Sequence, residues 1–361
     1  MFDKAFFGED VWEYLKRSQK PIILYGMGNG ADKVLKVFAQ KKIPCSGVMA
    51  SDDFVRGQQY QNFTVQPLRY FENLYGNDFI IAITFGTQIP QVIEHIRKLS
   101  QSHHMIVPNV PVYGEGIFDD NFISENREKI ELAYTLLSDS RSREVYCHAL
   151  KFYYSGNLDN LFQTFDSKDE VFQDILLLSS HENYMDLGAY RGDTIEELIR
   201  YTGGYEKIIA VEPDPKTYRK LCGYIADKEN ITVYQKLIWK KGKRSLLFAD
   251  NGGRNSTVSG KEGICTGSIT IDELGKDTAI SYIKMDVEGA EKEALAGGIQ
   301  TISHHMPKLN IAVYHRFEDI FEIPLLVYAM NQKYGFYLRH HPYIPMWDMN
   351  LYCVADGLRN Q

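Results

Sequence analysis

Hydrophobic and polar positions alternate along most of the chain in the pattern of an α/β protein. From Pro21 the sequence PIILYGMGNGADKVLKVFAQKKIPCSGVMASDD reads as a buried strand, a glycine turn, an amphipathic helix and a second strand. The apolar run at 78–86 predicts a further strand. It is followed by four apolar residues at the spacing of one helix face, which are Ile89, Val92, Ile93 and Ile96. We therefore expect a small Rossmann-like α/β domain over residues 1–120.

The pattern changes to purely helical periodicity over residues 121–180, which predicts a helical connector. From residue 184 the alternation of strands and helices returns, and a mostly parallel sheet with helices on both faces explains it most simply. The predicted strands are YMDLG, KIIAVEP, ITVYQKLIW, SYIKMDVEG, LNIAVYH, FYLRHH and NLYCVA. We expect an α/β fold in which a doubly wound Rossmann-like sheet over residues 181–361 follows the smaller domain and the connector.

Composition and charge narrow the class of protein. A chain of 361 residues with 44% hydrophobic and 24% charged residues is long enough for two globular cores. The formal net charge of −7 and the lack of a long basic block argue against a nucleic-acid partner. Five widely spaced cysteines and no apolar run of membrane-spanning length favour a cytoplasmic protein without a membrane partner. The sequence leaves open whether the chain forms a homo-oligomer.

The first candidate site is the stretch YMDLGAYRGDT at 184–194. A strand ends in Asp186 and leads into a turn with Gly188 and Gly192, and Asp193 follows at the expected start of a helix. A helix N-terminus normally favours anions, and two carboxylates beside it repel a phosphate. They suit a ligand that carries positive charge, such as S-adenosylmethionine with its sulfonium and ammonium groups. The alternative is that Asp186 only caps the helix.

A nucleoside ligand at this turn also needs a group that recognises its ribose. In α/β folds that group is an acidic residue at the end of the second strand. Glu212, in AVEPDP, has this position, and its carboxylate can accept hydrogen bonds from both ribose hydroxyls. The alternative is a solvated carboxylate at a strand end.

The strand SYIKMDVEG and the one after it supply the candidate catalytic groups. Lys284, Asp286 and Glu288 occupy alternate positions, and His315 ends the next strand. Methyl transfer to a hydroxyl requires alignment of the acceptor and removal of its proton, for which a carboxylate or histidine base is suited. Lys284 and Asp286 could instead form a buried ion pair, and His315 could be a hydrogen-bonded core histidine. We interpret Glu291 and Glu293 as first-turn charges that favour the helix dipole.

Five motifs in order resemble the FkbM family of S-adenosylmethionine-dependent methyltransferases. They are DLGAYRGDT, AVEPDP, TIDEL, IKMDVEGAE and YHRFEDIFEIP, and the resemblance spans about residues 180–355. It implies a Rossmann-like methyltransferase sheet in which Asp186, Gly188, Gly192 and Glu212 contact the cofactor. It also implies that Ala189, Tyr190, Asp193 and Thr194 are neighbours in the turn. Tyr190 departs from the usual pattern, because a glycine commonly occupies its position.

Three further features carry weaker predictions. Carboxylates and an imidazole would suit Mg²⁺, but the resemblance does not require a metal and we expect none. His340 and His341 are more typical of a strand end than of a metal site, because neighbouring strand residues point to opposite faces. The polar stretch NGGRNSTVSGKEG at 251–263 is either a mobile loop over the acceptor, with Asn255 and Ser256 as contacts, or a hairpin connection.

The first domain has a glycine turn of its own. Gly26, Gly28 and Gly30 follow a strand, and Asp52 lies just beyond the next one. This turn is closer to a phosphate-binding turn than the second one is, although Ala31 stands where the last glycine of G-x-G-x-x-G would be. It resembles the small Rossmann-like domains found beside sugar-modifying transferases, which leaves a nucleotide-binding turn, a degenerate scaffold and a dimer surface as alternatives.

These observations lead to two competing functions. The first is a methyltransferase that uses S-adenosylmethionine to methylate a hydroxyl of a sugar, glycan or other small molecule by in-line displacement. The second is a nucleotide-sugar-binding or NAD-binding protein or oxidoreductase that acts through the N-terminal domain. The acidic residues around Gly188 and the group from Lys284 to His315 favour the first. The identity of the acceptor, and whether oxygen or nitrogen is methylated, are beyond the sequence.

Overall fold

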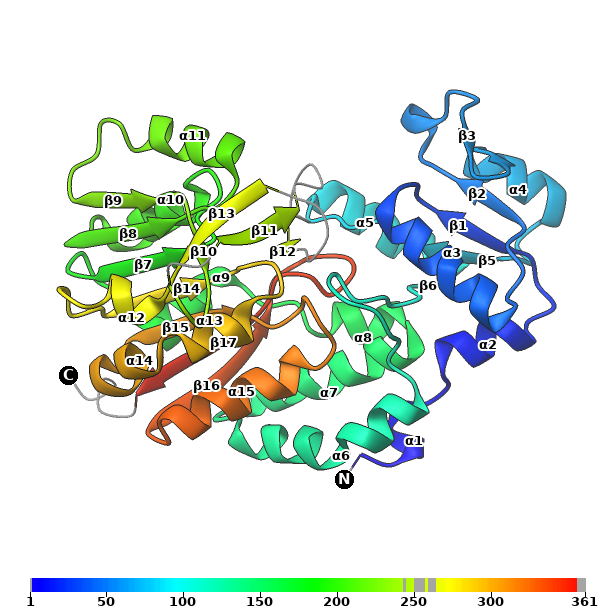
Figure 1. The fold of residues 1–361 in the computed structure, drawn as a ribbon. Coiled ribbons are helices and arrows are strands. Elements are labelled where there is room, and N and C mark those ends of the chain that lie inside the picture. The colour runs from blue at the N-terminus through cyan, green and yellow to red at the C-terminus, as the bar shows by residue number, and fades with distance from the viewer. Residues whose placement is uncertain (1, 243–244, 250–256, 259–263, 356–361) are drawn as a thin grey trace. The chain divides into compact units, whose positions relative to one another are not determined.

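The computed structural model describes residues 2–242, 245–249, 257–258 and 264–355 (Figure 1). The chain forms two compact units, and each is built from separate stretches. Unit 1 consists of 1–131, 143–166 and 340–348, and unit 2 of 132–142, 167–339 and 349–361. Each unit is described by itself below.

Unit 2 is organised around a seven-stranded sheet with the order β16-β17-β15-β14-β7-β8-β9. Its strands are β7 (Asn183–Leu187), β8 (Lys207–Val211), β9 (Ile231–Tyr234), β14 (Tyr282–Met285), β15 (Lys308–Ala312), β16 (Tyr334–His340) and β17 (Met349–Ala355). The five strands from β9 to β15 run parallel, and β17 is antiparallel to β15. The predicted doubly wound Rossmann-like fold is therefore confirmed.

Helices flank this sheet. They are α10 (Asp193–Thr202), α11 (Pro215–Tyr224), α12 (Ile271–Leu274), α13 (Glu291–Ala296), α14 (Ile299–His305) and α15 (Asp319–Met330). Ile195 and Leu198 of α10 and Leu221 of α11 join Ile208 and Ala210 of β8 in one buried cluster. The central strands are buried along nearly their whole length, as expected for a parallel sheet covered by helices.

One predicted strand is divided in the structure. The stretch 231–239 forms β9 at the edge of the large sheet and β10 (Leu237–Ile238) in a separate small sheet. The small sheet also contains β11 (Ser245–Ala249), β12 (Thr257–Val258) and β13 (Ile264–Ile269). The polar residues Gln235 and Lys236 separate the half-exposed β9 from the buried β10, which pairs with β13 instead of continuing β9.

Unit 1 contains a four-stranded sheet with the order β2-β1-β5-β6. The strands β1 (Ile22–Tyr25), β2 (Gly47–Met49), β5 (Ile80–Ile83) and β6 (His104–Ile106) are parallel. Its other elements are α1 (Lys4–Phe7), α2 (Val11–Arg17), α3 (Asn29–Lys41), the 3₁₀ turn η1 (Asp52–Phe54), β3 (Gln59–Tyr60), β4 (Phe63–Thr64), α4 (Leu68–Tyr75) and α5 (Pro90–Leu99). The smaller Rossmann-like α/β domain is thus present.

The predicted connector is helical. It contains α6 (Asp120–Leu136), α7 (Ser140–Ser155), α8 (Leu158–Phe162), α9 (Lys168–Glu170) and the π-helical turn η2 (Val171–Leu176). Its residues are shared between the two units, and the segment 340–348 between β16 and β17 also belongs to unit 1. There Ile344 bridges to Thr87, and Trp347 lies against Gly86. Domain limits at 120 and 180 remain a prediction.

Within the described part of the chain, every helix is too short or too polar to cross a lipid bilayer.

Candidate active site

The turn after β7 is held from within by a buried carboxylate. Asp186 has no exposed surface, and its Oδ2 accepts a hydrogen bond from the Thr194 hydroxyl in the first turn of α10. Burial raises the pKa of Asp186 to about 6, although Lys284 and Thr194 act in the opposite direction. Its Oδ1 is also buried and has no hydrogen-bond partner among the described residues.

Two glycines in this turn leave no room for a side chain. Gly188 has a φ of +87°, and a Cβ atom there would lie 2.0 Å from the backbone oxygen of Asp286. Gly192 has a φ of +94°, and a Cβ atom there would lie 2.3 Å from the ring of Tyr224. Both positions combine a left-handed backbone with a close approach, which only glycine accommodates.

Glu212 fixes the other side of the turn. Its Oε2 accepts from the backbone N–H of Tyr190 at 3.0 Å, and its Oε1 accepts from that of Asp214 at 2.9 Å. Burial raises the pKa of Glu212 to about 7, against the effect of these two hydrogen bonds. Of the other predicted turn residues, Ala189 is buried, Tyr190 is half-buried with a φ of +47°, and Asp193 is exposed.

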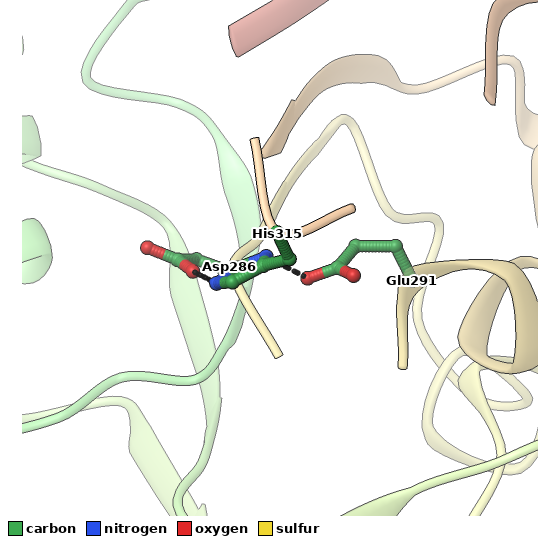
Figure 2. Close-up of side chains that lie close together, drawn as sticks. All are labelled: Asp286, Glu291 and His315. Carbon is green, nitrogen blue, oxygen red and sulfur yellow. Dashed lines mark ion pairs between the residues drawn. The ribbon is translucent and has the colours of Figure 1, made fainter. Parts of the chain in front are cut away.

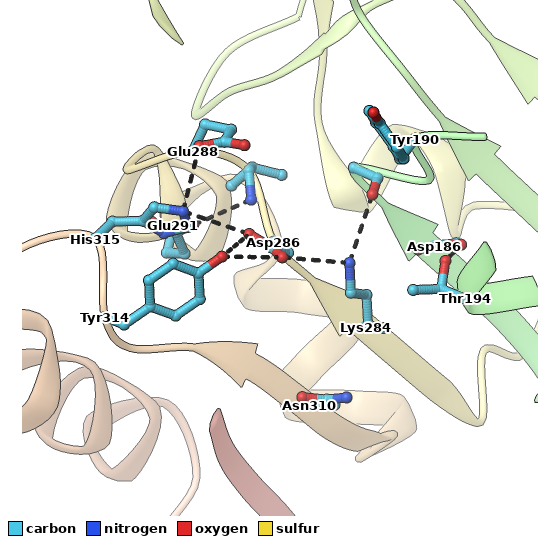
Figure 3. Close-up of polar contacts among 12 residues, drawn as sticks. Asp186, Tyr190, Thr194, Lys284, Asp286, Glu288, Glu291, Asn310, Tyr314 and His315 are labelled. Carbon is cyan, nitrogen blue, oxygen red and sulfur yellow. Dashed lines mark hydrogen bonds and ion pairs between the residues drawn. The ribbon is translucent and has the colours of Figure 1, made fainter. Parts of the chain in front are cut away.

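A row of polar residues crosses the sheet beside this turn. The strand register pairs Asp186 of β7 with Lys284 of β14, and Lys284 with Asn310 of β15. The Lys284 Nζ lies 3.5 Å from the carbonyl oxygen of Gly188 and 3.8 Å from Asp286 Oδ2 (Figure 3). Lys284 therefore links the turn to the second group of predicted site residues.

The second group is centred on His315, which directly follows Tyr314 after β15. The His315 side chain has no exposed surface and carries a carboxylate on each ring nitrogen (Figure 2). Nδ1 lies 3.0 Å from Glu291 Oε1, and Nε2 lies 3.4 Å from both Asp286 Oδ1 and Glu288 Oε2. Burial alone would lower the pKa of His315, but the carboxylates raise it well above its usual value.

Asp286 and Glu288 are the accessible members of this group. Their side chains are 31% and 30% exposed, in contrast to the buried His315 beside them. Asp286 also accepts from the Tyr314 hydroxyl, at 3.2 Å to Oδ1 and 3.3 Å to Oδ2. Glu288 has a φ of +54°, a conformation that L-residues rarely adopt and that often accompanies function. Burial raises its pKa, and His315 opposes that shift.

Sequence reasoning missed three residues that surround His315. Glu291 was interpreted as a first-turn charge, but its side chain is 1% exposed and turned back onto His315. Tyr314 and Asp319 lie in the motif YHRFEDIFEIP, but the sequence assigned them no role. Asp319 accepts a hydrogen bond from the backbone N–H of Arg316. Burial, and to a smaller extent the negative charge of the nearby Glu291, raises the pKa of Asp319 to about 8.

Asp286, Glu291 and His315 each offer an atom within 4.8 Å of the others, which is a spacing that a metal ion could use. The two carboxylates, however, lie on different nitrogens of the ring (Figure 2). A metal binds only one nitrogen of a neutral imidazole, so this arrangement fits a doubly paired imidazolium better than a metal centre.

Other predicted features lie elsewhere. Asn255 and Ser256, and most of the stretch 251–263, are outside the described residues. His340 and His341 are buried. The Nδ1 of His340 lies 2.7 Å from the Thr164 hydroxyl, and burial lowers its pKa to about 3.

The glycine turn of unit 1 is tightly packed. A Cβ atom on Gly30 would lie 2.2 Å from the backbone oxygen of Thr84, and one on Gly26 would lie 2.9 Å from the ring of Phe85. Asp32, in the first turn of α3, accepts hydrogen bonds from Tyr60 and Gln61. The first turn of α3 therefore contains an acidic residue, as the first turn of α10 does.

Comparison with known protein families identifies the family of the domain in unit 2. Residues 186–338 match the family model described as the methyltransferase FkbM domain, and this range contains every residue of the candidate site. This part of the chain is an FkbM methyltransferase domain. The resemblance that the five sequence motifs carry is thereby confirmed.

The FkbM methyltransferase domain and unit 1 also occur together in a solved structure. The crystal structure of methyltransferase FkbM from Methylobacillus flagellatus KT is 22% identical, with a TM-score of 0.71, and the match covers 97% of this chain and 95% of that one. At this identity the likeness shows that the fold is shared along almost the whole chain.

More distant structures match about half of the chain. Fibrillarin from Aeropyrum pernix, in complex with S-adenosyl-L-methionine, is 15% identical with a TM-score of 0.31, covering 49% of this chain and 69% of that one. A putative tRNA (m1A22) methyltransferase from Streptococcus pneumoniae, also with S-adenosyl-L-methionine, is 14% identical with a TM-score of 0.34, covering 53% and 73%. No curated protein sequence matches the chain.

Proposed function

We propose that the protein transfers a methyl group from S-adenosylmethionine to a hydroxyl of a sugar, glycan or other small molecule. The observation that carries the proposal is the pair of half-exposed carboxylates, Asp286 and Glu288, joined through Lys284 to the glycine turn after β7. This reaction needs two things: a turn that holds the methyl donor, and a base next to that turn.

The residues of the turn fit this cofactor. Glu212 uses one hydrogen bond on each oxygen, and a carboxylate has about four lone-pair sites, so acceptor capacity remains for ribose hydroxyls. Gly188, Ala189, Tyr190, Gly192 and Asp193 would line the methionine part. Asp186 and Thr194 would hold the turn in shape, since Asp186 is fully buried and bonded to Thr194. When bound, S-adenosylmethionine supplies an electrophilic methyl group with a neutral thioether as leaving group.

We assign the role of base to Glu288. The oxygens of Asp286 already accept from Tyr314 and face Lys284 and His315, which lowers their capacity to take a proton. Glu288 is half-exposed, and its raised pKa is closer to the working pH, as efficient general bases require. In this proposal Asp286 orients the acceptor hydroxyl, and Lys284 places a positive charge 3.8 Å from its carboxylate.

His315 has a supporting role in the proposal. A histidine can act as a base only when it is neutral and accessible, whereas His315 is buried and carboxylates on both nitrogens raise its pKa. Its charge instead reduces the repulsion between Asp286 and Glu288, which both lie 3.4 Å from its Nε2.

The acceptor should be neutral or cationic. The carboxylates of Asp286 and Glu288 are partly exposed while the His315 side chain between them is buried, so an anionic acceptor such as a nucleic acid would be repelled. The formal net charge of the whole chain, −7, also disfavours an anionic acceptor. No step of the proposed reaction uses Mg²⁺, and the widely spaced cysteines support a cytoplasmic location.

Calorimetric titration of the full chain with S-adenosylhomocysteine tests the proposal. We expect saturable binding that Glu212→Ala weakens at least about tenfold, because the loss of a charged hydrogen-bond acceptor typically costs 1.5–3 kcal/mol. Parallel titrations with NAD and a UDP-sugar test the competing function. If only NAD or the UDP-sugar binds, and Glu212→Ala has no effect, the methyltransferase site assignment is wrong. A panel of methyl glycosides, with release of S-adenosylhomocysteine as the signal, then tests the acceptor class.

A further inference from the structure

One buried carboxylate, that of Glu291, contacts both His315 and the turn that carries Glu288. The Oε1 atom of Glu291 accepts from the backbone N–H of Val287 at 3.0 Å and from that of Gly289 at 3.4 Å. The same atom lies 3.0 Å from His315 Nδ1 (Figure 3). Glu291 is 1% exposed, so it cannot itself reach an acceptor molecule.

These contacts bear directly on Glu288. Val287 and Gly289 are its two neighbours in the chain, so Glu291 accepts from the backbone N–H groups of the residues before and after the one with a φ of +54°. A left-handed conformation at a non-glycine residue persists only where surrounding contacts impose it. Glu291 supplies such contacts.

The contacts also bear on Asp286 through the histidine. With Nδ1 against Glu291, the imidazole ring directs Nε2 at Asp286 and Glu288, which are both 3.4 Å away. The charged groups facing His315 come from several elements. Asp286 follows β14, Glu288 lies in the next turn, Glu291 begins α13 and Asp319 begins α15. The Arg316 guanidinium, beside His315, donates to the carbonyl oxygen of Gly289 at 3.2 Å.

We propose that Glu291 is a positioning residue: it holds the 287–289 turn and His315 so that Asp286 and Glu288 present their carboxylates together to the acceptor. The proposal rests on the proposed methyl transfer for its consequence in catalysis. The geometric part, in which Glu291 keeps His315 charged and oriented, can be tested without an acceptor or a cofactor.

The main experiment is a histidine side-chain ¹⁵N NMR titration of the full chain, comparing the wild type with Glu291→Gln. The signal of His315 is assigned by its loss in His315→Gln. We expect the wild-type imidazole to stay cationic across the neutral range, and its pKa to fall by about one unit or more in Glu291→Gln, because one facing charge is removed. Glu293→Gln, on the same helix, is the matched control and should leave the His315 signal unchanged.

The catalytic part is measured as release of S-adenosylhomocysteine with the best methyl glycoside of the panel. Glu291→Gln should lower kcat by about 10-fold to 100-fold, the scale of misplacement effects, with the KM for S-adenosylmethionine unchanged. Glu291→Asp keeps the charge but is one methylene too short to span the turn and the ring. It should keep His315 cationic yet still lower kcat, and it serves as the test if Glu291→Gln does not fold.

Two results would overturn the proposal. One is an unchanged His315 titration in Glu291→Gln, or an unchanged kcat in both Glu291 variants. The other is a metal centre: added Mg²⁺ converting His315 to a neutral, bound form, or Mn²⁺ broadening its signal at stoichiometric concentration. Failure of wild-type protein to bind S-adenosylhomocysteine would instead count against the proposed function, since the NMR titration contains no cofactor.

Discussion

Gly188 and Asp286 approach each other so closely that a methyl group on Gly188 would lie 2.0 Å from the carbonyl oxygen of Asp286. The first belongs to the turn after β7 and the second follows the neighbouring strand β14. This approach places the proposed cofactor turn directly beside the proposed catalytic carboxylates. It also makes the position sensitive to substitution.

Gly188→Ala should therefore destabilise the methyltransferase domain by about 3 kcal/mol, from left-handed strain and overpacking together. The measurements are the midpoint of urea unfolding and, separately, the unfolding temperature obtained by calorimetry. Gly223→Ala, within α11, is the control, because no described atom beyond its chain neighbours and its own helix backbone lies within 4 Å of its Cβ position, and its φ is not positive. That change should stabilise the domain by about 0.5–1 kcal/mol. Equal effects of the two substitutions would contradict the close approach.

Cofactor binding should depend on pH through Glu212. Its pKa is raised to about 7, and ribose hydroxyls that donate to the carboxylate favour its charged form. The affinity for S-adenosylhomocysteine should therefore fall as pH decreases from about 8 to about 6, with proton release on binding near pH 7. Calorimetry in two buffers with different ionisation enthalpies measures the released proton. A flat affinity profile would remove Glu212 from the contacts with the ribose.

Glu288→Gln should lower kcat by about 10²-fold to 10⁴-fold, the usual contribution of a general base, while the affinity for S-adenosylhomocysteine stays within about twofold. The pH–rate profile should lose its acidic limb in this variant, because the group that must be deprotonated is gone. Asp286→Asn should act on the acceptor KM as well as on kcat, since Asp286 is proposed to orient the hydroxyl. If Glu288→Gln retains the acidic limb, another group is the base.

Stability should fall as pH rises through the neutral range. Asp319 has a pKa raised to about 8 in the folded chain, against 3.8 for the ordinary group, so the folded state retains a proton that the unfolded state has lost. The contribution of Asp319 to the free energy of unfolding is therefore fully present below about pH 4 and is lost as pH rises to about 8. The raised pKa of His315 acts in the same direction above pH 6.5.

Scanning calorimetry of the cofactor-free protein should thus show a lower unfolding temperature at pH 8 than at pH 6.5. One such group lowers the free energy of unfolding by about 1 kcal/mol per pH unit in this range. Asp319→Asn should flatten this dependence, since the amide can still accept the Arg316 N–H and no longer titrates. A variant with the same slope as the wild type would show that Asp319 is ionised in the folded protein.

Much of the fold was predictable because its signals are local. Apolar runs bounded by glycine and acidic residues located β7, β8, β14 and β15, and periodicity located α10 and α11. The division of 231–239 into two strands was not predictable. It depends on which sheet each half joins, and pairing with β13 is a contact between residues far apart in the sequence.

The site shows the same limit. Asp186, Gly188 and Glu212 stand at or next to strand ends and Gly192 caps the helix that follows, so topology alone brings them together. The role of Glu291 depends on the direction of its side chain, which helix periodicity does not specify beyond one face. The pKa of His315 likewise depends on the carboxylates of Asp286, Glu288 and Glu291, which raise it and whose approach to the buried ring the sequence does not show.

The segment 340–348 belongs to unit 1 although it lies between two strands of the methyltransferase domain. Recombination that copied the N-terminal part alone would leave behind Ile344, which bridges to Thr87, and Trp347, which lies against Gly86. Unit 1 is therefore complete only when a segment that follows β16 in the chain is present. The crystal structure of methyltransferase FkbM from Methylobacillus flagellatus KT, matched over 97% of this chain, shares the fold of both units.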